Sequence, residues 1–251
     1  MAEDRTGSLW DRGLLANPHA LADKRMRVQR MFAAIAGSYD INNRLHSLWQ
    51  DQTWRRKAVQ IAAVKSGDVV VDVACGTGDS ALAFAAGGAR RVIAVDFTWE
   101  MLPLAGAKAR GQASNVRFVA GDAMRLPLAD ACADVASIAF GIRNLADPAG
   151  AMREFHRILR PGGRLVILEF SLPTNRILRW LYNLYFRRVL PLTATLISGD
   201  RTGAYRYLPE SVNTFIGREQ MALMMREAGL VEVRQHPLTL GVCVCYRGVR
   251  G

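Results

Sequence analysis

Cysteine is scarce in this sequence, and its few copies are not spaced for a metal or redox site. The four cysteines are Cys75, Cys132, Cys243 and Cys245, and no two of them have C-x-x-C spacing. Cys243 and Cys245 would share one face of a strand. No cluster of candidate metal ligands is visible elsewhere. We therefore expect buried free thiols in a reducing compartment and no metal site.

Long apolar runs are also missing. No stretch approaches ~18 uninterrupted apolar residues, so we expect no membrane-spanning segment. The first residues include Glu3 and Asp4 and lack the apolar region of a secretory signal. These absences predict a cytoplasmic protein.

Acidic residues are few relative to basic ones. Lys and Arg number 33 against 22 Asp and Glu, a net charge of +11. Such an excess favours an anionic partner, either nucleic acid or a membrane surface. No run of basic residues interleaved with stacking aromatics forms a nucleic-acid track, so we expect no nucleic-acid partner. With 251 residues, half of them apolar, the chain can form one large α/β domain.

The most informative stretch runs from Val69 to Asp79, Val-Val-Val-Asp-Val-Ala-Cys-Gly-Thr-Gly-Asp. It predicts a buried parallel strand, a glycine turn at Gly76 and Gly78, and a helix over 79–86. Such an elbow at the carboxyl edge of a sheet binds nucleotide-type ligands. NAD and S-adenosylmethionine both fit the glycine pattern. We expect Asp72 at the strand tip, facing the ligand, where a carboxylate suits a sulfonium and an ammonium and repels a pyrophosphate, which favours adenosylmethionine.

Two further acids end the next two predicted strands. Asp96 follows strand 91–96 at the spacing expected of a ribose ligand, although an N-cap of the next helix fits the same position. Asp122 follows strand 116–119, where the adenine of adenosylmethionine would lie. Strands at 134–140 and 164–170 alternate with helices, which predicts a Rossmann-like, doubly wound, mostly parallel sheet. Two closing strands, 231–235 and 240–246, would end the domain, the last one antiparallel.

The segments outside this alternation are harder to interpret. We expect a loose arm over 1–22, a single domain over 23–251, N-terminal helices that cover the ligand edge, and an insertion over about 175–217. In the helix 176–187, a wide apolar arc lies beside a narrow stripe that includes Arg176, Arg179 and Arg187. Such a helix either packs as a lid on the domain or lies on a bilayer.

With these pieces the chain resembles the ubiquinone/menaquinone biosynthesis C-methyltransferase family, within the class I adenosylmethionine-dependent methyltransferases. The resemblance covers about residues 26–248. Its most specific segments are Phe140-Gly141-Ile142-Arg143-Asn144 and Tyr205-Arg206-Tyr207-Leu208, beside the elbow and Leu168-Glu169-Phe170. The N-P-P-Y type segment of amino-methylating enzymes is absent. The resemblance implies a seven-stranded class I fold, with N-terminal helices and a helical insertion after the fifth strand.

The resemblance also implies a reaction: S-adenosylmethionine-dependent methylation of a ring carbon in a demethylated isoprenoid quinol. The cofactor residues carried over are Thr77, Asp96, Asp122, Ala123 and Ala139, and the elbow adds Asp72, Gly76 and Gly78. Ala139 stands where the family often has Ser, and Cys75 where it often has Gly. Alternatives are a nucleic-acid methyltransferase and a non-catalytic cofactor-binding member of a quinone-synthesis complex.

For the chemistry we expect Arg143 to stabilise a phenolate of the ring. Because Arg cannot accept the proton, a water or a neighbour such as Tyr39 or Asp122 would do so. His46 is a further candidate base, although a packing role suits it as well. The quinol is held in a bilayer, so we also expect peripheral membrane contact at the inner face of the cytoplasmic membrane. Self-association or a place in a quinone-biosynthesis complex is a further expectation.

Overall fold

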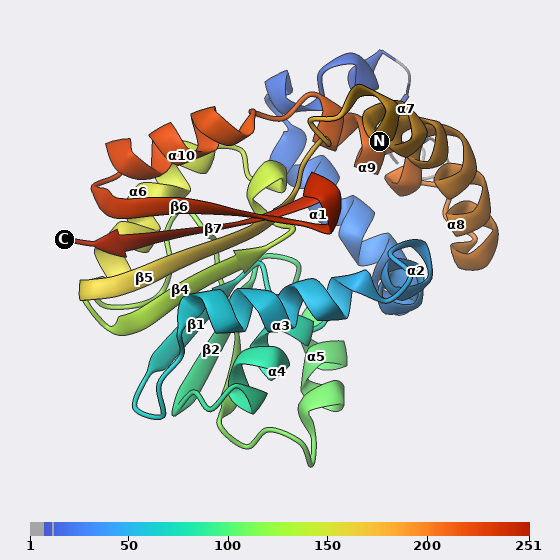
Figure 1. Ribbon diagram of the computed structural model, residues 1–251. Coiled ribbons are helices and arrows are strands. Elements are labelled where there is room, and N and C mark those ends of the chain that lie inside the picture. Colours follow the sequence, from blue (N-terminus) through green and yellow to red (C-terminus); the bar gives the residue numbers. More distant parts are fainter. Residues whose placement is uncertain (1–7, 12) are drawn as a thin grey trace.

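A twisted seven-stranded sheet forms the centre of the protein, as the computed structural model of residues 8–11 and 13–251 shows (Figure 1). Its strand order is β3-β2-β1-β4-β5-β7-β6. The strands are β1 (Val69–Val73), β2 (Arg91–Asp96), β3 (Val116–Ala120), β4 (Ala133–Ala139), β5 (Leu159–Phe170), β6 (Leu230–Leu238) and β7 (Cys243–Arg250).

The strand directions confirm the predicted fold class. β1 pairs in parallel with β2 and β4, β2 with β3, and β4 with β5, whereas β7 runs antiparallel to both β5 and β6. All five residues of β1 are buried, as expected of a central strand that is covered on both faces. The carboxyl ends of the parallel strands therefore meet at one edge, where the elbow lies.

Helices cover both faces of the sheet and one end of it. The α-helices are α1 (Lys24–Ile35), α2 (Tyr39–His46), α3 (Gln50–Ala62), α4 (Asp79–Ala86), α5 (Met101–Ala109), α6 (Pro148–Ile158), α7 (Arg176–Leu184), α8 (Leu190–Ser198), α9 (Ala204–Asn213) and α10 (Arg218–Glu227). The described residues also contain the short 3₁₀ turns η1 (Leu14–Ala16), η2 (Pro18–Ala20), η3 (Ala36–Ser38), η4 (Ile142–Asn144) and η6 (Thr239–Gly241).

Two apolar cores lie on opposite faces of the sheet. Met152 and Phe155 of α6 pack with Met221 and Met225 of α10 on one face. On the other face, Trp54 of α3 and Phe84 of α4 pack against the strands. The alternation of side chains along β1 divides it between the two cores, with Val71 and Val73 in the first and Val70 in the second.

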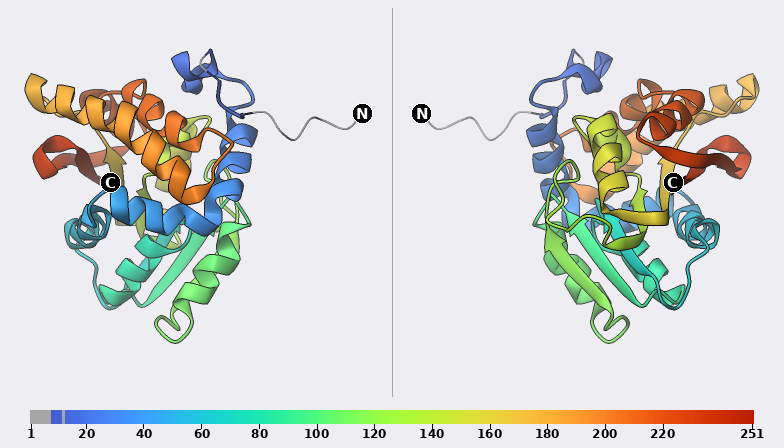
Figure 2. Two further views of the ribbon diagram at one scale, coloured as in Figure 1. Left: turned by 90° about the vertical axis from the view of Figure 1, so that its right-hand side faces the viewer. Right: turned by 90° about the vertical axis from the view of Figure 1, so that its left-hand side faces the viewer.

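A third core binds the helical end together. It joins Trp10, Met31 of α1, Phe186, Leu190 of α8 and Tyr207 of α9. Figure 2 shows these N-terminal and 176–213 segments gathered beyond the strand ends. We call this assembly the cap.

The N-terminal segment differs from the loose arm expected over 1–22. Residues 1–7 and 12 of that arm lie outside the described residues. In the remainder, Trp10 is buried, its ring stacks on Tyr207 with centroids 4.3 Å apart, and its Nε1 donates to the sulfur of Met31. Apolar side chains from distant segments create this contact, so local sequence did not reveal it.

The first part of the insertion, residues 176–198, forms one continuous helical stretch. A π-helical turn, η5 (Tyr185–Val189), joins α7 to α8. One side, with Tyr182, Phe186 and Leu190, packs into the cap. The basic stripe is partly used within the protein, because Arg187 pairs with Glu210 at 2.7 Å and Arg179 donates to the carbonyl of Pro173. The inner side of these helices therefore packs on the rest of the protein, while their outer side keeps exposed apolar residues such as Leu192 and Leu196.

Two segments that looked polar in sequence are helical. The segment 38–46 contains α2, and 200–218 contains α9 despite Pro209 within it. In α9 the side chains of Tyr205 and Tyr207 are buried in the cap, which offsets their polar appearance. Among the described residues, no helix is long and apolar enough to cross a membrane.

Candidate active site

The glycine elbow adopts the conformation that its residues predicted. Gly76 and Gly78 have φ values of +53° and +87°, which favour glycine. A Cβ on Gly78 would also lie 3.1 Å from the ring of Phe118. The elbow thus turns tightly into α4, and only glycine fits its second position.

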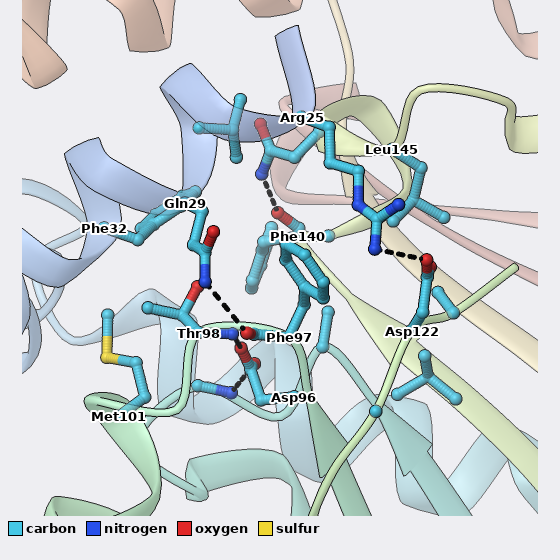
Figure 3. Close-up of a pocket in the computed structure, with 18 of the residues that line it drawn as sticks. Arg25, Gln29, Phe32, Asp96, Phe97, Thr98, Met101, Asp122, Phe140 and Leu145 are labelled. Atoms are coloured by element: carbon cyan, nitrogen blue, oxygen red, sulfur yellow. Dashed lines mark hydrogen bonds and ion pairs between the residues drawn. The ribbon is translucent and has the colours of Figure 1, made fainter. Parts of the chain in front are cut away.

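A first cavity of about 820 Å³ opens beside this elbow, at the carboxyl ends of the strands (Figure 3). Of the predicted cofactor residues, five line it: Gly76, Asp96, Asp122, Ala123 and Ala139. Arg25, Gln29 and Phe32 of α1 line the opposite side. The first cavity therefore lies between the sheet edge and a helix of the cap.

Asp96 is buried and held by backbone amides. Its two carboxylate oxygens accept from the N–H groups of Gly76 and Thr98, both at 2.7 Å. Burial raises the pKa of its carboxyl group, and these hydrogen bonds oppose the rise. Asp96 does not cap the next helix, because α5 begins at Met101 and its N-cap is Glu100. Each oxygen of Asp96 retains a further acceptor site at the cavity, so a ribose-binding role stays a prediction.

Asp122 reaches the same cavity from the end of β3. It accepts from the N–H of Met124 at 3.0 Å and pairs with Arg25 of α1 at 2.8 Å (Figure 3). The guanidinium of Arg25 also lies 4.2 Å from the ring centroid of Phe97. Arg25 therefore ties the cap to two loops of the sheet edge.

Three predicted cofactor residues do not line the first cavity: Asp72, Thr77 and Gly78. Asp72 was expected at a strand tip, but β1 continues to Val73, and the Asp72 side chain is buried on the face of the second core. Neither of its oxygens has a hydrogen-bond partner in the described part of the chain. Burial raises the pKa of Asp72 to about 7, against the opposing charge of Arg55. The expectation that Asp72 faces the ligand is wrong for this geometry.

Thr77 instead belongs to a polar network under the elbow. Its hydroxyl donates to Asp40 of α2 at 2.5 Å. Lys108 of α5 pairs with Asp40 at 2.5 Å and with Asp79 of α4 at 2.6 Å. Arg44 approaches Asp79 at 3.4 Å. This network, which we call the latch, connects α2 of the cap to the sheet domain.

A second cavity of about 620 Å³ adjoins the first. Phe32, Tyr39 and Phe140 line both, so these three side chains mark where the cavities meet. The ring of Tyr39 packs edge-on against Phe32, and burial raises the pKa of its hydroxyl. Tyr39 is thus a neutral phenol between two compartments.

Arg143 lines the second cavity and not the first. Its Nη1 donates to Glu169 at 2.5 Å and to the carbonyl of Phe140 at 2.8 Å, and its Nε donates to Ser211. Its Nη2 has no hydrogen bond to the described residues, which leaves this group for a ligand. The charge of Glu169 raises the pKa of Arg143 against the effect of burial.

Sequence reasoning missed several polar side chains in or directly behind these cavities. Glu169 was noted within a family segment but given no role, and Asp51 and Arg55 of the second cavity were not singled out. Asp51 is buried and accepts from Ser47 and Gln52, both at 2.9 Å. The predicted parallel sheet gave a signal for Glu169. Because β4 and β5 are neighbours, the end of β5 with Glu169 lies beside the end of β4, which Arg143 follows.

A third cavity of about 800 Å³ continues from the second towards the surface of the cap. The two share Asn43, Ser47, Phe170, Tyr205 and Leu208. Trp54, Tyr182, Phe186 and Leu190 make much of its lining apolar. His46 lies here, 3.1 Å from the hydroxyl of Tyr185, and burial lowers its pKa. His46 is therefore away from the junction of the first two cavities.

Comparison with known proteins identifies relatives over almost the whole chain. A model of the ubiE/COQ5 methyltransferase family matches residues 20–250. The chain is 46% identical over 222 residues to a demethylmenaquinone methyltransferase of Thermus thermophilus, covering 88% of this chain and all of that relative. It is 39% identical to a ubiquinone/menaquinone biosynthesis C-methyltransferase of a Geobacter species, covering 92% of this chain and all of the relative.

Solved structures show the same fold at lower identity. A SAM-dependent methyltransferase of Thermotoga maritima, described as a possible histamine N-methyltransferase, superposes with a TM-score of 0.62 at 21% identity, covering 89% of this chain and all of that one. One from Aquifex aeolicus gives 0.58 at 18% identity over 78% and 89% of the two chains. The fold is that of the class I adenosylmethionine-dependent methyltransferases.

Proposed function

Because the chain belongs to the ubiE/COQ5 methyltransferase family, we propose that it methylates a ring carbon of a demethylated isoprenoid quinol. The methyl donor is S-adenosylmethionine, and the acceptor is demethylmenaquinol, with the corresponding benzoquinol as a second substrate. The observation that carries this proposal is the meeting of two cavities at Tyr39 and Phe140. One compartment suits a nucleoside and the other a ring.

The chemistry of the first cavity fits adenosylmethionine. Asp96 offers acceptor sites to ribose hydroxyls, and Asp122 offers one to the exocyclic amine of adenine. Gly76, Ala123 and Ala139 let the ligand approach the backbone. When bound, the cofactor supplies a sulfonium-activated methyl group. Thr77 would contribute once its bond to Asp40 rearranges.

Arg143 is the residue that we assign to the acceptor ring. A phenol with a pKa of about 10 costs roughly 4 kcal/mol to ionise at pH 7, from ~3 units at 1.36 kcal/mol each. The Nη2 group of Arg143 offsets part of this cost by donating to the phenolate oxygen. Glu169 holds the guanidinium from the opposite side, which orients the free donor towards the cavity.

Asp51 is the group that we assign as proton acceptor. Tyr39 is neutral and serves as a donor, because burial raises its pKa. Asp122 lines the first cavity only and already pairs with Arg25. Asp51 is the carboxylate that lines the second cavity in the described residues, and it can accept the phenol proton directly or through a water.

The third cavity suits the isoprenoid tail. It continues from the ring compartment, and its aromatic and aliphatic lining would exclude water from the chain. The tail would then leave towards the turn between α2 and α3, where Leu48 is 78% exposed.

The same region forms an exposed apolar face. Leu48 and Trp49 stand out from the turn with φ of +51° and +60°, a conformation that costs energy for residues with side chains. Leu192 and Leu196 of the neighbouring α8 are 69% and 83% exposed. With a net charge of +11 this face supports peripheral binding to an anionic membrane, the source of the quinol.

The direct test is transfer of labelled methyl from adenosylmethionine to reduced demethylmenaquinone and, in parallel, to the demethylated benzoquinol. We expect transfer to the naphthoquinol, and none to the oxidised forms, because only a hydroxyl can be ionised to activate the ring. Cofactor binding without transfer to either quinol would contradict the proposed reaction. It would direct attention to nucleic-acid acceptors and to a non-catalytic role.

A further inference from the structure

Lys24 is a buried lysine whose three N–H groups all have partners. It is the first residue of α1 and only 2% exposed. Its Nζ donates to the carbonyls of Leu145 at 2.6 Å and Arg143 at 2.8 Å, and it lies 3.1 Å from Nδ1 of His19. Three acceptors match the three protons of an ammonium group. Among the described residues no carboxylate pairs with it, so its bonds serve the backbone of one turn.

His19 completes this arrangement from the segment before α1. Its Nε2 lies 2.9 Å from the carbonyl oxygen of Ser211, which can only accept, so Nε2 carries the proton. Nδ1 is then free to accept from Lys24. Burial lowers the pKa of His19 to about 4, and the charges of Lys24 and Arg143 act in the same direction. The imidazole is therefore neutral with a defined tautomer.

The turn that Lys24 grips carries groups for both cavities. Arg143 lines the second cavity, whereas Asn144 and Leu145 line the first. The chain enters the turn through Phe140, whose φ of +59° is strained for a residue with a side chain. A strained entry needs external support to keep the turn in one conformation.

We propose that Lys24 is a positioning residue, and that its bonds to His19 and to the carbonyls of Arg143 and Leu145 fix the turn so that Arg143 faces the acceptor ring. Lys24 faces His19 of η2 and Arg143 of η4, whereas the carbonyl of Ser211 in α9 holds His19 from its other side. The expected effect of Lys24 on the reaction rate rests on the proposed function, whereas its expected effect on the conformation of residues 141–146 does not.

Protonation of Lys24 controls this support. Burial, together with the charge of Arg143, lowers its pKa to about 8. A neutral amine has two protons for three acceptors, so the grip weakens as pH rises through that value. The free energy of unfolding does not fall with this loss of support. Because the folded state binds fewer protons than the unfolded state between about pH 8 and 10.5, deprotonation of Lys24 does not destabilise the fold.

Hydrogen exchange tests the grip without any substrate. In the Lys24→Met variant, amides of residues 141–146 should exchange about fivefold faster or more, while the strands of the sheet stay protected. Arg27→Met is the matched control, since Arg27 of α1 also donates to a backbone carbonyl, that of Leu9, but not to the turn. Unchanged exchange at 141–146 in Lys24→Met, or an equal increase in Arg27→Met, would overturn the proposal.

Turnover supplies the second test. We expect kcat of Lys24→Met to fall about tenfold or more, as for a misplaced catalytic group, while Arg27→Met stays near wild type. The loss in the variant, relative to wild type, should shrink between about pH 7 and 9 as Lys24 of the wild type deprotonates, with no matching loss of wild-type stability. A constant ratio across this range would refute the role of the ammonium. An inactive wild type with slower exchange than Lys24→Met would instead reject the proposed reaction and keep the positioning role.

Discussion

Arg143 and Glu169 form an ion pair in which both side chains are 5% exposed or less. Removing one partner of such a pair leaves an uncompensated buried charge. The pair also explains how a cation can stand beside an apolar ring site, because Glu169 balances it when no phenolate is bound. Within the protein Nη1 of Arg143 is occupied by Glu169 and Phe140, so only the remaining N–H groups of its guanidinium can act on the substrate.

The Arg143→Lys variant tests whether the guanidinium acts on the acceptor ring. We expect it to bind adenosylmethionine with unchanged affinity, since Arg143 does not line the first cavity, and to lose most turnover. A lysine keeps the charge next to Glu169 but lacks the planar fork that serves Glu169 and a ligand together. Calorimetric cofactor binding and kcat measure the two effects. Wild-type turnover would remove Arg143 from the mechanism.

Asp51→Asn tests the proton acceptor. The variant should lose about 10²-fold or more in kcat, the usual contribution of a positioned base. Its deficit relative to wild type should narrow as pH rises towards the pKa of the quinol, because the ring then ionises without help. A rate comparison across pH measures this ratio. A deficit that does not change with pH would show that Asp51 shapes the cavity and takes no proton.

Asp72 is a carboxyl group whose burial disfavours its ionised form. Its pKa is raised to about 7 in the folded protein, so its favourable, protonated state is lost as pH rises through that value. Asp72→Asn should therefore stabilise the cofactor-free protein at pH 8 by up to ~4 kcal/mol, from ~3 units at 1.36 kcal/mol each, and by much less near pH 4. Urea unfolding at both pH values checks this.

The control for this experiment is Asp130→Asn, because Asp130 forms an exposed pair with Arg157. Exposed pairs contribute little to stability, so we expect a small change at either pH. A gain for Asp72→Asn that is equal at both pH values would contradict the ionisation argument.

At the scale of elements, the latch decides how α2 meets the sheet domain. Lys108 is the cation between Asp40 of α2 and Asp79 at the start of α4. Lys108 thereby links a carboxylate of the cap to a carboxylate at the N-terminus of α4, where a negative charge is favourable. Because α2 begins with Tyr39, movement of α2 would also move the wall between the first two cavities.

Lys108→Met should release α2. Asp40 is then left without a cation and Asp79 keeps only the more distant Arg44, so we expect a loss of about 1–3 kcal/mol in unfolding free energy and a higher KM for both substrates. Adding Asp40→Asn should recover part of both losses, because it removes one of the two charges. Lys57→Met, at an exposed position of α3, is the control. Strictly additive effects in this double-mutant cycle would show that the two residues are not coupled.

At the scale of the whole molecule, the three cavities and the exposed apolar face form one path. It leads from the sheet edge through the ring compartment to the turn at Leu48 and to α8. A bilayer at that face would receive the tail without exposing it to water. Under the proposed function, the soluble cofactor and the isoprenoid tail would then occupy opposite ends of this path.

Leu196→Ser tests the membrane contact. We expect binding to anionic vesicles to weaken about tenfold, the equivalent of ~1.4 kcal/mol for one side chain that no longer enters the interface. Turnover of a short-tailed quinol in solution should not change. Leu223→Ser is the matched control, because Leu223 is an exposed leucine of α10, away from this face. Equal vesicle binding by wild type and Leu196→Ser would contradict this orientation.

The sequence by itself determined the sheet, the elbow and the family. These features follow from local patterns: strands that alternate with helices, two glycines at one turn, and acids at strand ends. Each pattern depends on the backbone preferences of neighbouring residues. Asp96 and Asp122 were placed at the first cavity in this way, because a residue at the end of a parallel strand must lie at the carboxyl edge of the sheet, while their roles as cofactor ligands stay a prediction.

Only the tertiary structure decided which side chains meet. Asp72 lies one residue before the end of its strand, and the two-residue alternation turns it into the core, so a shift of one position reversed its predicted environment. Glu169, Asp51 and Lys24 come from segments far from Arg143 in sequence. The pairing of β5 with β4 brings Glu169 to Arg143, and the packing of the N-terminal helices brings Asp51 and Lys24, and long-range contacts of these kinds leave no local pattern.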